Sequence, residues 1–483
     1  MGSDDQDALL LKLQQQLLNR WPSAALENQA NKVTSRLLHE TGDWDPPAGI
    51  KPSTDPIPMA VGIPDSTTLP RDAFSSHASR ILAQHDEAAW VYGFGAGYAK
   101  LRAQLAARIN QTKGTRIDEN WLQLTNGSAG AIDLICRCLI NPGDVIITES
   151  PAYMGTLRNF RGVQAEIHSV PMDANGLDTQ ALQALVQSLQ AQGKTIKLIY
   201  TIATFSNPTG ASLTLARRLE LLQIAADSGI LVLDDDAYGD LYFGDQPPAS
   251  LAALSAGHGV ITVGSFSKVL ATGLRIGWIQ CTPALQKIFS SMRFAMGLNQ
   301  LMVRVVSEFM QDGQLDSHIN TVRQLYARKM HILADALDHH AGDFMDFSRP
   351  RGGFYLWASL HGGVTATNLW RQAAMQGVSI TPGVNFYSGR KDPDGEHVRL
   401  AFSWTPIERL EEGAARIALA CRLAAQLTAP VAPSQPLAQI QNPRQAEINQ
   451  VSGNLAGTTK KTCLSSPKAP SPHRYNGSAG DQR

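Results

Sequence analysis

Short apolar runs alternate with helical segments along the middle of the chain. Between about residue 74 and about residue 310, runs such as VIITES, AEIHSV, KLIYTI and GVITVGS are each separated from the next by residues with helical spacing. Parallel strands need long crossover connections, which are usually helices. We therefore predict an α/β fold with a mostly parallel central sheet and helices on both of its faces.

The pattern changes on both sides of this region and suggests four parts. Residues 1–70 combine a helical stretch with a Pro-rich arm that we assign to a smaller lobe, and residues 71–312 form the predicted large domain. Residues 313–428 contain a long helix, a strand pair around GGFYLWASL and a final helix, which indicates a smaller α+β lobe. Residues 429–483 are rich in Pro, Ser, Gln and Gly, so we predict a disordered tail.

Composition narrows the class of protein. The 42 Lys and Arg balance the 42 Asp and Glu, so we expect no nucleic-acid or membrane partner. No apolar run approaches the ~20 residues of a membrane helix, and the acidic start does not resemble a signal peptide. The five scattered cysteines argue for a reducing, cytoplasmic location. The closest pair, Cys136 and Cys138, does not match metal-ligand spacing; we predict buried thiols and no metal site.

The segment GSFSKVLATGLRIGW, residues 264–278, carries the first candidate chemistry. Two serine hydroxyls (Ser265 and Ser267), backbone N–H groups and Arg275 suit a phosphate dianion. Lys268 beside them could form an imine with an aldehyde. Taken alone, this turn fits a solvated surface lysine equally well.

A second segment, LVLDDDAYGDL, places three aspartates after an apolar strand. Ligands of open α/β sheets bind at the carboxyl edge where these side chains would lie. One carboxylate there could keep a pyridinium nitrogen protonated, so that the ring accepts electrons. By itself, the pattern is more typical of a metal site or a helix cap.

Further segments offer single candidate groups. In TNGSAGAIDL, Ser128 and Ala129 would present backbone N–H groups at the start of a helix, although an ordinary helix cap has the same pattern. Asn207 in FSNPTG could reach a ligand with its amide, and Tyr153 in ESPAYMG could stack on a flat ring. Arg399 lies in a strand-like run and needs a partner, either a substrate carboxylate or an internal acid.

The order of these motifs along the chain is highly specific. The series GSAGAIDL, ESPAYMG, FSNPTG, DDDAYGDL, SFSK and LRIGW resembles the class I/II aminotransferases of fold type I, nearest to the α-aminoadipate and kynurenine aminotransferases. The resemblance extends from about residue 60 to about residue 427. It implies the pyridoxal-5′-phosphate (PLP) dependent transferase fold, PLP as cofactor and a homodimer with shared active sites.

The resemblance also implies roles for individual residues. Lys268 would form the Schiff base with PLP and transfer the α-proton, Asp235 would pair with the pyridine nitrogen, and Tyr238 with Asn207 would bind the ring's phenolic oxygen. Tyr153 would stack on the ring. The phosphate would be bound by Ser128, Ala129, Ser265, Ser267 and Arg275. Tyr92 would contact the cofactor in the partner subunit's site. The substrate would be bound by Gly62, Asn207 and Arg399.

The implied reaction moves an amino group from an α-amino acid to a 2-oxo acid. Other PLP reactions (β- or γ-replacement, cyclisation, oxidation, decarboxylation) remain alternatives, because all of them steer one common carbanion. A PLP-sensing regulator is a further alternative, disfavoured because only about 55 residues precede the matching region. The chain departs from its relatives at Ala129, Gly130, Ala203, Thr204 and Ser206, which puts the substrate pocket in doubt more than the cofactor site.

Overall fold

The fold is described from a computed structural model of the chain. The structure describes residues 3–20, 33–34, 47, 49–51, 53–84, 87–93, 95–292, 297–311, 313–389, 392 and 396–428. The predicted tail and most of the predicted N-terminal arm therefore lie outside the described residues. The predicted N-terminal helix is present as α1 (Ser3–Arg20).

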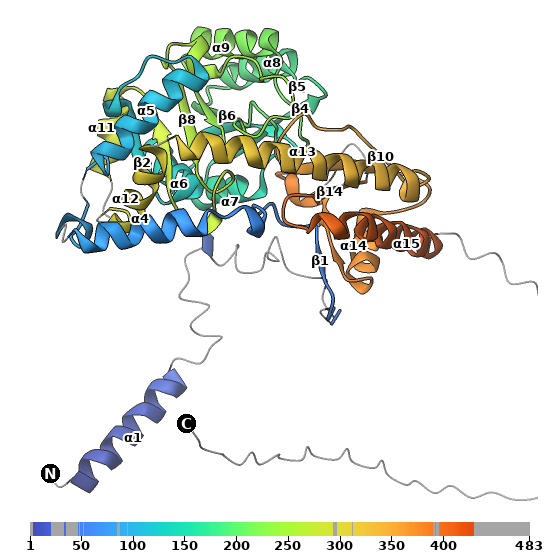
Figure 1. Cartoon of the computed structure of the whole chain (residues 1–483), viewed down its shortest axis with the longest axis horizontal. Coiled ribbons are helices and arrows are strands. Elements are labelled where there is room, and N and C mark those ends of the chain that lie inside the picture. Colours follow the sequence, from blue (N-terminus) through green and yellow to red (C-terminus); the bar gives the residue numbers. More distant parts are fainter. Residues whose placement is uncertain are drawn as a thin grey trace, which may run out of the picture. The chain divides into compact units, whose positions relative to one another are not determined.

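An eight-stranded sheet forms the centre of the fold (Figure 1). Its order is β2 (Leu122–Thr125), β9 (Gly277–Gln280), β8 (Val260–Ser265), β7 (Leu231–Asp235), β6 (Ile196–Thr201), β3 (Val145–Ser150), β4 (Glu166–Asp173) and β5 (Gly176–Leu177). The strands from β8 to β4 are parallel, whereas β2, β9 and β5 pair antiparallel with their neighbours. The prediction of a mostly parallel sheet is confirmed.

Helices cover both faces of the sheet because the central strands are apolar on both sides. In β3, Ile146 belongs to one buried core, while Val145 and Ile147 belong to another. This alternation is the two-residue repeat of a strand. The helices over the sheet are α5 (Ala99–Lys113), α6 (Gly127–Leu139), α7 (Met154–Gly162), α8 (Thr179–Ala191), α9 (Leu215–Ser228), α10 (Leu251–Leu254), α11 (Pro283–Ser291) and α12 (Gln300–Gln311), with α4 (Arg71–Ala83) packed on α12.

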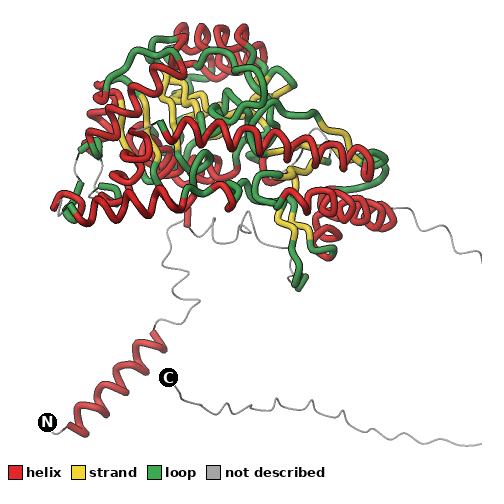
Figure 2. Tube along the Cα trace, in the orientation of Figure 1, coloured by secondary structure: helices red, strands yellow, loops and turns green. Residues whose placement is uncertain are grey.

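A smaller antiparallel sheet forms the second part of the fold (Figure 2). Its strands are β10 (Met345–Phe347), β11 (Tyr355–Leu360), β14 (His397–Ala401) and β13 (Thr381–Pro382), in that order. The long helix α13 (Gln314–Ala341) packs on α15 (Leu410–Thr428), which also contacts α14 (Ala366–Met375). The short strand β1 (Ile57–Pro58) pairs with β12 (Val378–Ser379), so the end of the predicted arm meets C-terminal residues.

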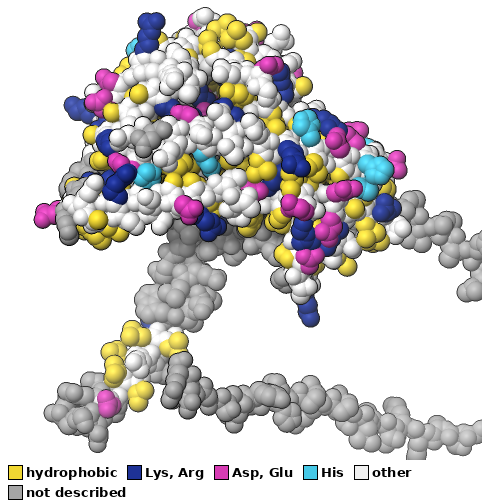
Figure 3. Space-filling model, in the orientation of Figure 1, with side chains coloured by type: hydrophobic (Ala, Val, Ile, Leu, Met, Phe, Trp, Pro, Cys, Tyr) yellow, Lys and Arg dark blue, Asp and Glu magenta, His cyan; other side chains and the backbone are white. Residues whose placement is uncertain are grey.

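Most of the described cysteines are buried, as the sequence predicts. Of the four described cysteines, Cys136, Cys281 and Cys421 are buried, but Cys138 is only half-buried because it lies near the end of α6. No described helix is both long enough and apolar enough to cross a bilayer. On the face drawn in Figure 3, basic and acidic side chains of the described residues are interspersed rather than gathered by sign.

Candidate active site

Lys268 lies in the turn that follows β8, where it is only partly accessible to solvent. Its Nζ donates a hydrogen bond of 2.7 Å to the carbonyl oxygen of Gly62 and lies 5.8 Å from the centre of the Tyr238 ring. Burial lowers the pKa of Lys268, and the charge of Arg399 lowers it further. A lysine with a lowered pKa is more often neutral, and the neutral amine is the nucleophilic form.

Asp235 is the last residue of β7 and is 4% exposed. Its Oδ2 accepts a hydrogen bond of 3.3 Å from the Tyr200 hydroxyl, while its Oδ1 has no hydrogen-bond partner among the described residues. Burial raises the pKa of Asp235 to about 7, and the charge of Lys268 acts in the opposite direction. A buried carboxylate oxygen with no partner is costly, so this atom fits a cationic ligand group.

The two aspartates beside Asp235 face elsewhere, as the strand alternation predicts. The Oδ1 of Asp234 accepts a hydrogen bond of 3.4 Å from the Ala203 N–H, and Asp236 forms an ion pair of 3.1 Å with Lys113. β7 ends at Asp235, so Asp236 lies just outside the strand. Among the three, Asp235 is the one whose raised pKa the charge of Lys268 partly offsets, while Asp234 and Asp236 contact other groups.

Arg399, in β14, is fully buried beside the same cluster. Its Nη1 donates to Asn207 Oδ1 at 2.7 Å, and its Nη2 donates to the carbonyl oxygen of Ala60 at 2.6 Å. Its guanidinium carbon lies 4.2 Å from the centre of the Tyr355 ring. The arginine and the amide predicted to bind substrate and cofactor are therefore in direct contact.

The start of α6 offers the predicted anion site. Arg275 donates from Nη2 to the carbonyl oxygen of Asn126 at 2.8 Å, directly before the helix. The helix cap at Asn126 has no side-chain hydrogen bond, so the N–H groups of Ser128 and Ala129 remain available to a ligand. A Cβ added to Gly127 would lie 2.8 Å from Arg275 Nη2, so only glycine leaves this space open. Helix N-termini with an adjacent arginine favour phosphate.

The remaining predicted residues divide into two groups. Ser265 and Ser267 are buried, with their hydroxyls 2.9 Å apart, and Tyr153 begins α7 close enough to Tyr238 to influence its pKa. Tyr92 is 66% exposed on the surface instead. Its role in a partner's site therefore stays a prediction.

The structure adds two residues that the sequence did not single out. The hydroxyl of Tyr355 lies 3.1 Å from that of Tyr238, and the charges of Arg399 and Lys268 lower the pKa of Tyr355 despite its burial. Tyr355 stands in GGFYLW, where only a strand was predicted.

Glu149, at 0% exposure in β3, is the second. Its carboxylate accepts hydrogen bonds from the Thr201 and Ser206 hydroxyls at 2.7 and 2.9 Å and from the Ile202 N–H at 3.2 Å. Burial raises its pKa to about 7. Glu149 thus holds the segment that leads into Asn207. An acidic residue within the buried run VIITES was the signal in the sequence.

Comparisons with known proteins agree with this geometry. The family model "Aminotransferase class I and II" matches residues 54–417. The aromatic-amino-acid aminotransferase 1 of Thermococcus litoralis is 31% identical over 368 residues, covering 76% of this chain and 88% of the relative. The structure of LysN, an α-aminoadipate aminotransferase from Thermus thermophilus complexed with N-(5′-phosphopyridoxyl)-L-leucine, has a TM-score of 0.71 at 30% identity and covers 85% of this chain and 99% of LysN.

A relative with another name also matches. YdfD of Bacillus subtilis, named an uncharacterised HTH-type transcriptional regulator, is 27% identical in a match that covers 75% of this chain and 73% of its own length. The fold and the comparisons define a fold-type-I PLP enzyme. The chain belongs to the aminotransferase class I and II family; it is a PLP-dependent aminotransferase.

The residues present fit this cofactor. Asp235 Oδ1 lacks a partner that a protonated ring nitrogen would supply, and Gly127 leaves the space beside Arg275 that a phosphate group would need. Lys268, the only lysine in the cluster among the described residues, would bind the aldehyde.

Proposed function

We propose that the cluster around Lys268 is the place where this aminotransferase transfers the amino group of an α-amino acid to a 2-oxo acid. The observation that carries the proposal is that the half-buried Lys268 lies near two buried charged side chains, Asp235 and Arg399, whose charges both act on it. These three groups supply a nucleophilic amine, a partner for a ring cation and a partner for a carboxylate.

PLP supplies an aldehyde that binds amines and a pyridine ring that accepts electron density from the bond being broken. Lys268 would hold the cofactor through its aldehyde, and its amine, when free, would be the base that takes the α-proton of the substrate. Burial lowers its pKa, which increases the neutral fraction of the amine, the form that a general base requires. Asp235 would keep the ring nitrogen protonated, because its Oδ1, which has no partner among the described residues, could accept that hydrogen bond.

Arg399 binds the α-carboxylate of the substrate. Its contacts with Asn207 and Ala60 fix the direction of the guanidinium, so a carboxylate meets a preorganised fork. Asn207 and Tyr238 would bind the ring oxygen, Tyr153 would pack on the ring, and Gly62 would border the substrate. The phosphate would be held by Ser128, Ala129, Ser265, Ser267 and Arg275.

The working form is a cytoplasmic homodimer with shared active sites. Trp90, Val91 and Tyr92 are adjacent in sequence and are 72%, 58% and 66% exposed, and such apolar exposure is typical of an interaction surface. In the dimer, Tyr92 reaches the cofactor of the partner subunit.

The reaction is tested by separating its two halves. The PLP form is mixed with single amino acids, including aromatic ones and α-aminoadipate, and the cofactor absorbance and the released keto acid are followed. A stoichiometric keto acid, and recovery of the starting spectrum when a 2-oxo acid is added, are the expected results. Release of carbon dioxide, or elimination without a matching keto acid, would favour another PLP reaction instead.

A further inference from the structure

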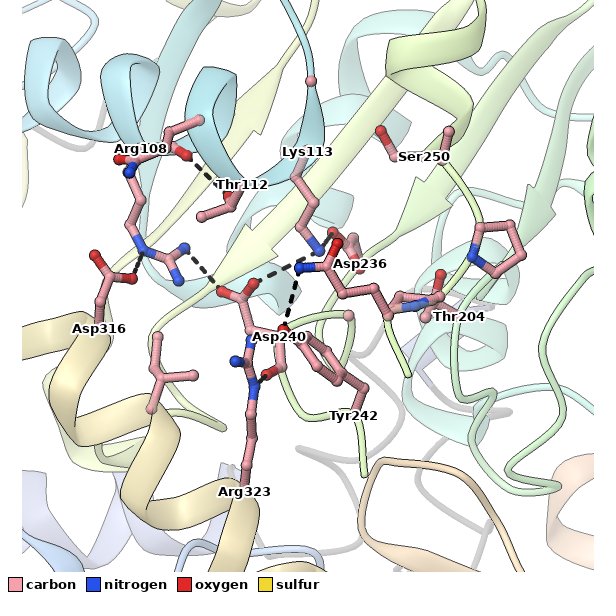
Figure 4. Close-up of a pocket in the computed structure, with 18 of the residues that line it drawn as sticks. Arg108, Thr112, Lys113, Thr204, Asp236, Asp240, Tyr242, Ser250, Asp316 and Arg323 are labelled. Atoms are coloured by element: carbon pink, nitrogen blue, oxygen red, sulfur yellow. Dashed lines mark hydrogen bonds and ion pairs between the residues drawn. The ribbon is translucent and has the colours of Figure 1, made fainter. Parts of the chain in front are cut away.

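A pocket of about 520 Å³ lies near the end of β7, and Asp235 is not among the residues that line it (Figure 4). Asp234 and Asp236 line it, together with the end of α5, the loop after β7 and the first part of α13. Its volume is typical of small-ligand sites. None of the groups assigned above to the amino-transfer site belongs to this pocket.

Most charges in the pocket already form ion pairs. Arg108 contacts both Asp240 and Asp316 at 2.8 Å, and Lys113 contacts Asp236 at 3.1 Å and Asp240 at 3.6 Å. Figure 4 shows this network on one side of the pocket. All five of these charged groups therefore already have a partner of opposite charge within the network.

Arg323, which projects from α13, has no carboxylate within ion-pair distance among the described side chains. Its Nη1 donates to Asn320 Oδ1 at 3.0 Å, its Nε donates to the carbonyl oxygen of Asp240, and its guanidinium carbon lies 3.7 Å from the centre of the Tyr242 ring. Its Nη2 has no hydrogen-bond partner in the described part of the chain. The tyrosine holds the guanidinium in place with one edge available to an anion.

Asp234, in contrast, is a carboxylate that forms no ion pair with a described cation. It is 3% exposed, lines the pocket and accepts one long hydrogen bond, 3.4 Å from the Ala203 N–H. The buried Arg218 acts on its charge, but the guanidinium of Arg218 bonds to the carbonyl oxygens of Ala203 and Leu213 and to the Thr204 hydroxyl. Burial, reinforced by Asp236, raises the pKa of Asp234 to about 7. A nearby cation would stabilise its ionised form.

We propose that this pocket binds a zwitterionic amino acid, with the ligand carboxylate on Arg323 and the ligand ammonium on Asp234. A simple anion would leave Asp234 without a cation, and a simple amine would leave Arg323 without a carboxylate. No group of three or more metal-ligating side chains occurs among the described residues, which argues against a metal ion. The Thr204 and Ser250 hydroxyls in the lining offer further hydrogen bonds.

The proposal rests on the charges of the pocket and not on the function proposed for Lys268. A ligand here would lie beside the strand that ends at Asp235, so an amino acid bound in this pocket would be an effector rather than a substrate. The test therefore uses protein that cannot turn over: holoenzyme treated with borohydride, which fixes the cofactor to its lysine.

Calorimetric titrations of this protein with L-alanine, β-alanine and 5-aminopentanoate vary the separation of the two ligand charges. Propionate and ethylamine are the singly charged controls. One of the zwitterions should bind once per chain, and the singly charged analogues should bind about tenfold or more weakly, since one lost charge-assisted contact corresponds to roughly that factor. Absence of binding by all three zwitterions would overturn the proposal.

Variants separate this pocket from the Lys268 cluster. Arg323→Gln and Asp234→Asn should each weaken binding by about tenfold or more, whereas Arg323→Lys should retain most of it. Arg328→Gln, at an exposed arginine on the same helix, is the matched control and should bind as the unchanged protein does. Circular dichroism checks folding, and if Asp234→Asn does not fold, Arg323→Gln decides alone. Unchanged binding in Arg323→Gln would mean that the amino acid binds elsewhere.

Discussion

Asp235 has a carboxylate oxygen without a partner among the described residues, whereas its neighbours Asp234 and Asp236 contact Ala203 and Lys113. Asp235→Asn keeps the shape of the side chain and removes the charge that would hold a proton at the ring nitrogen. Turnover should fall about a hundredfold or more, which corresponds to ~3 kcal/mol of transition-state stabilisation. Attachment of the cofactor to Lys268 should persist, because that bond does not need the carboxylate.

The matched control is Asp236→Asn, because Asp236 faces Lys113 instead of the cluster. Its effect on turnover should be much smaller. Steady-state kinetics and the cofactor spectrum of both variants give the comparison. Normal turnover in Asp235→Asn together with loss in Asp236→Asn would show that the wrong aspartate has been assigned to the ring.

Glu149 makes stability depend on pH. Its carboxyl has an ordinary pKa of 4.5 and the fold raises this pKa to about 7, so between these pH values the unfolded chain loses a proton that the folded chain keeps. The resulting contribution to the free energy of unfolding is fully present below pH 4.5 and is lost as the pH rises through 7. This contribution is about 1.4 kcal/mol for each pKa unit by which the Glu149 carboxyl in the folded chain exceeds the same carboxyl in the unfolded chain.

Glu149→Gln removes this titration. The variant should therefore lose more stability relative to the unchanged protein at pH 5 than at pH 8, as measured by urea unfolding of cofactor-free protein. Glu166→Gln is the control, since the hydrogen bond from Lys194 lowers the pKa of the half-buried Glu166 further below the tested window. Equal differences at both pH values for Glu149→Gln would contradict the assignment.

Among single residues, the sequence predicted those that stand in motifs and missed those that act through packing. Lys268, Asn207 and Arg399 were predicted in advance, and the structure brings them into one cluster. Tyr355 was missed because its contact with Tyr238 joins residues 117 positions apart, and no local pattern encodes that distance.

At the scale of elements, the segment that follows β1 reaches the cluster through Gly62. A Cβ at this position would lie 2.0 Å from the Tyr355 hydroxyl, so Gly62→Ala must displace that tyrosine or the segment itself. Since Gly62 also accepts the hydrogen bond from Lys268, kcat/KM should fall by about tenfold to a hundredfold. Gly162→Ala, at a glycine with open space around it, should leave the kinetics unchanged. Equal kinetics for the two variants would argue against this packing constraint.

The elements themselves were largely predictable, and the exceptions have physical causes. The parallel strands β3, β7 and β8 are buried on both faces, which makes them visible as nearly continuous hydrophobic runs. β9 (Gly277–Gln280) was not predicted, because it has only four residues and begins with a glycine that packs against Gly127. Its antiparallel pairing with both β2 and β8 could not be derived from local periodicity.

At the scale of the whole molecule, the homodimer is tested by complementation. Lys268→Ala chains lack the amine, and Tyr92→Ala chains lack the side chain expected to enter the partner's site. After subunit exchange in an equal mixture, half of the dimers should be hybrids with one intact site each, which predicts roughly a quarter of full activity. This requires that each variant alone is inactive. Absence of recovery, with exchange verified by mass spectrometry, would contradict the shared site.

The central claim is that Lys268 binds the cofactor. Borohydride reduction of the PLP form, followed by proteolysis and mass spectrometry, identifies the lysine that carries the reduced cofactor. The label should be found on the peptide containing Lys268, and Lys268→Ala protein should bind PLP without acquiring a label. A label on any other lysine, or continued labelling of Lys268→Ala, would contradict the account.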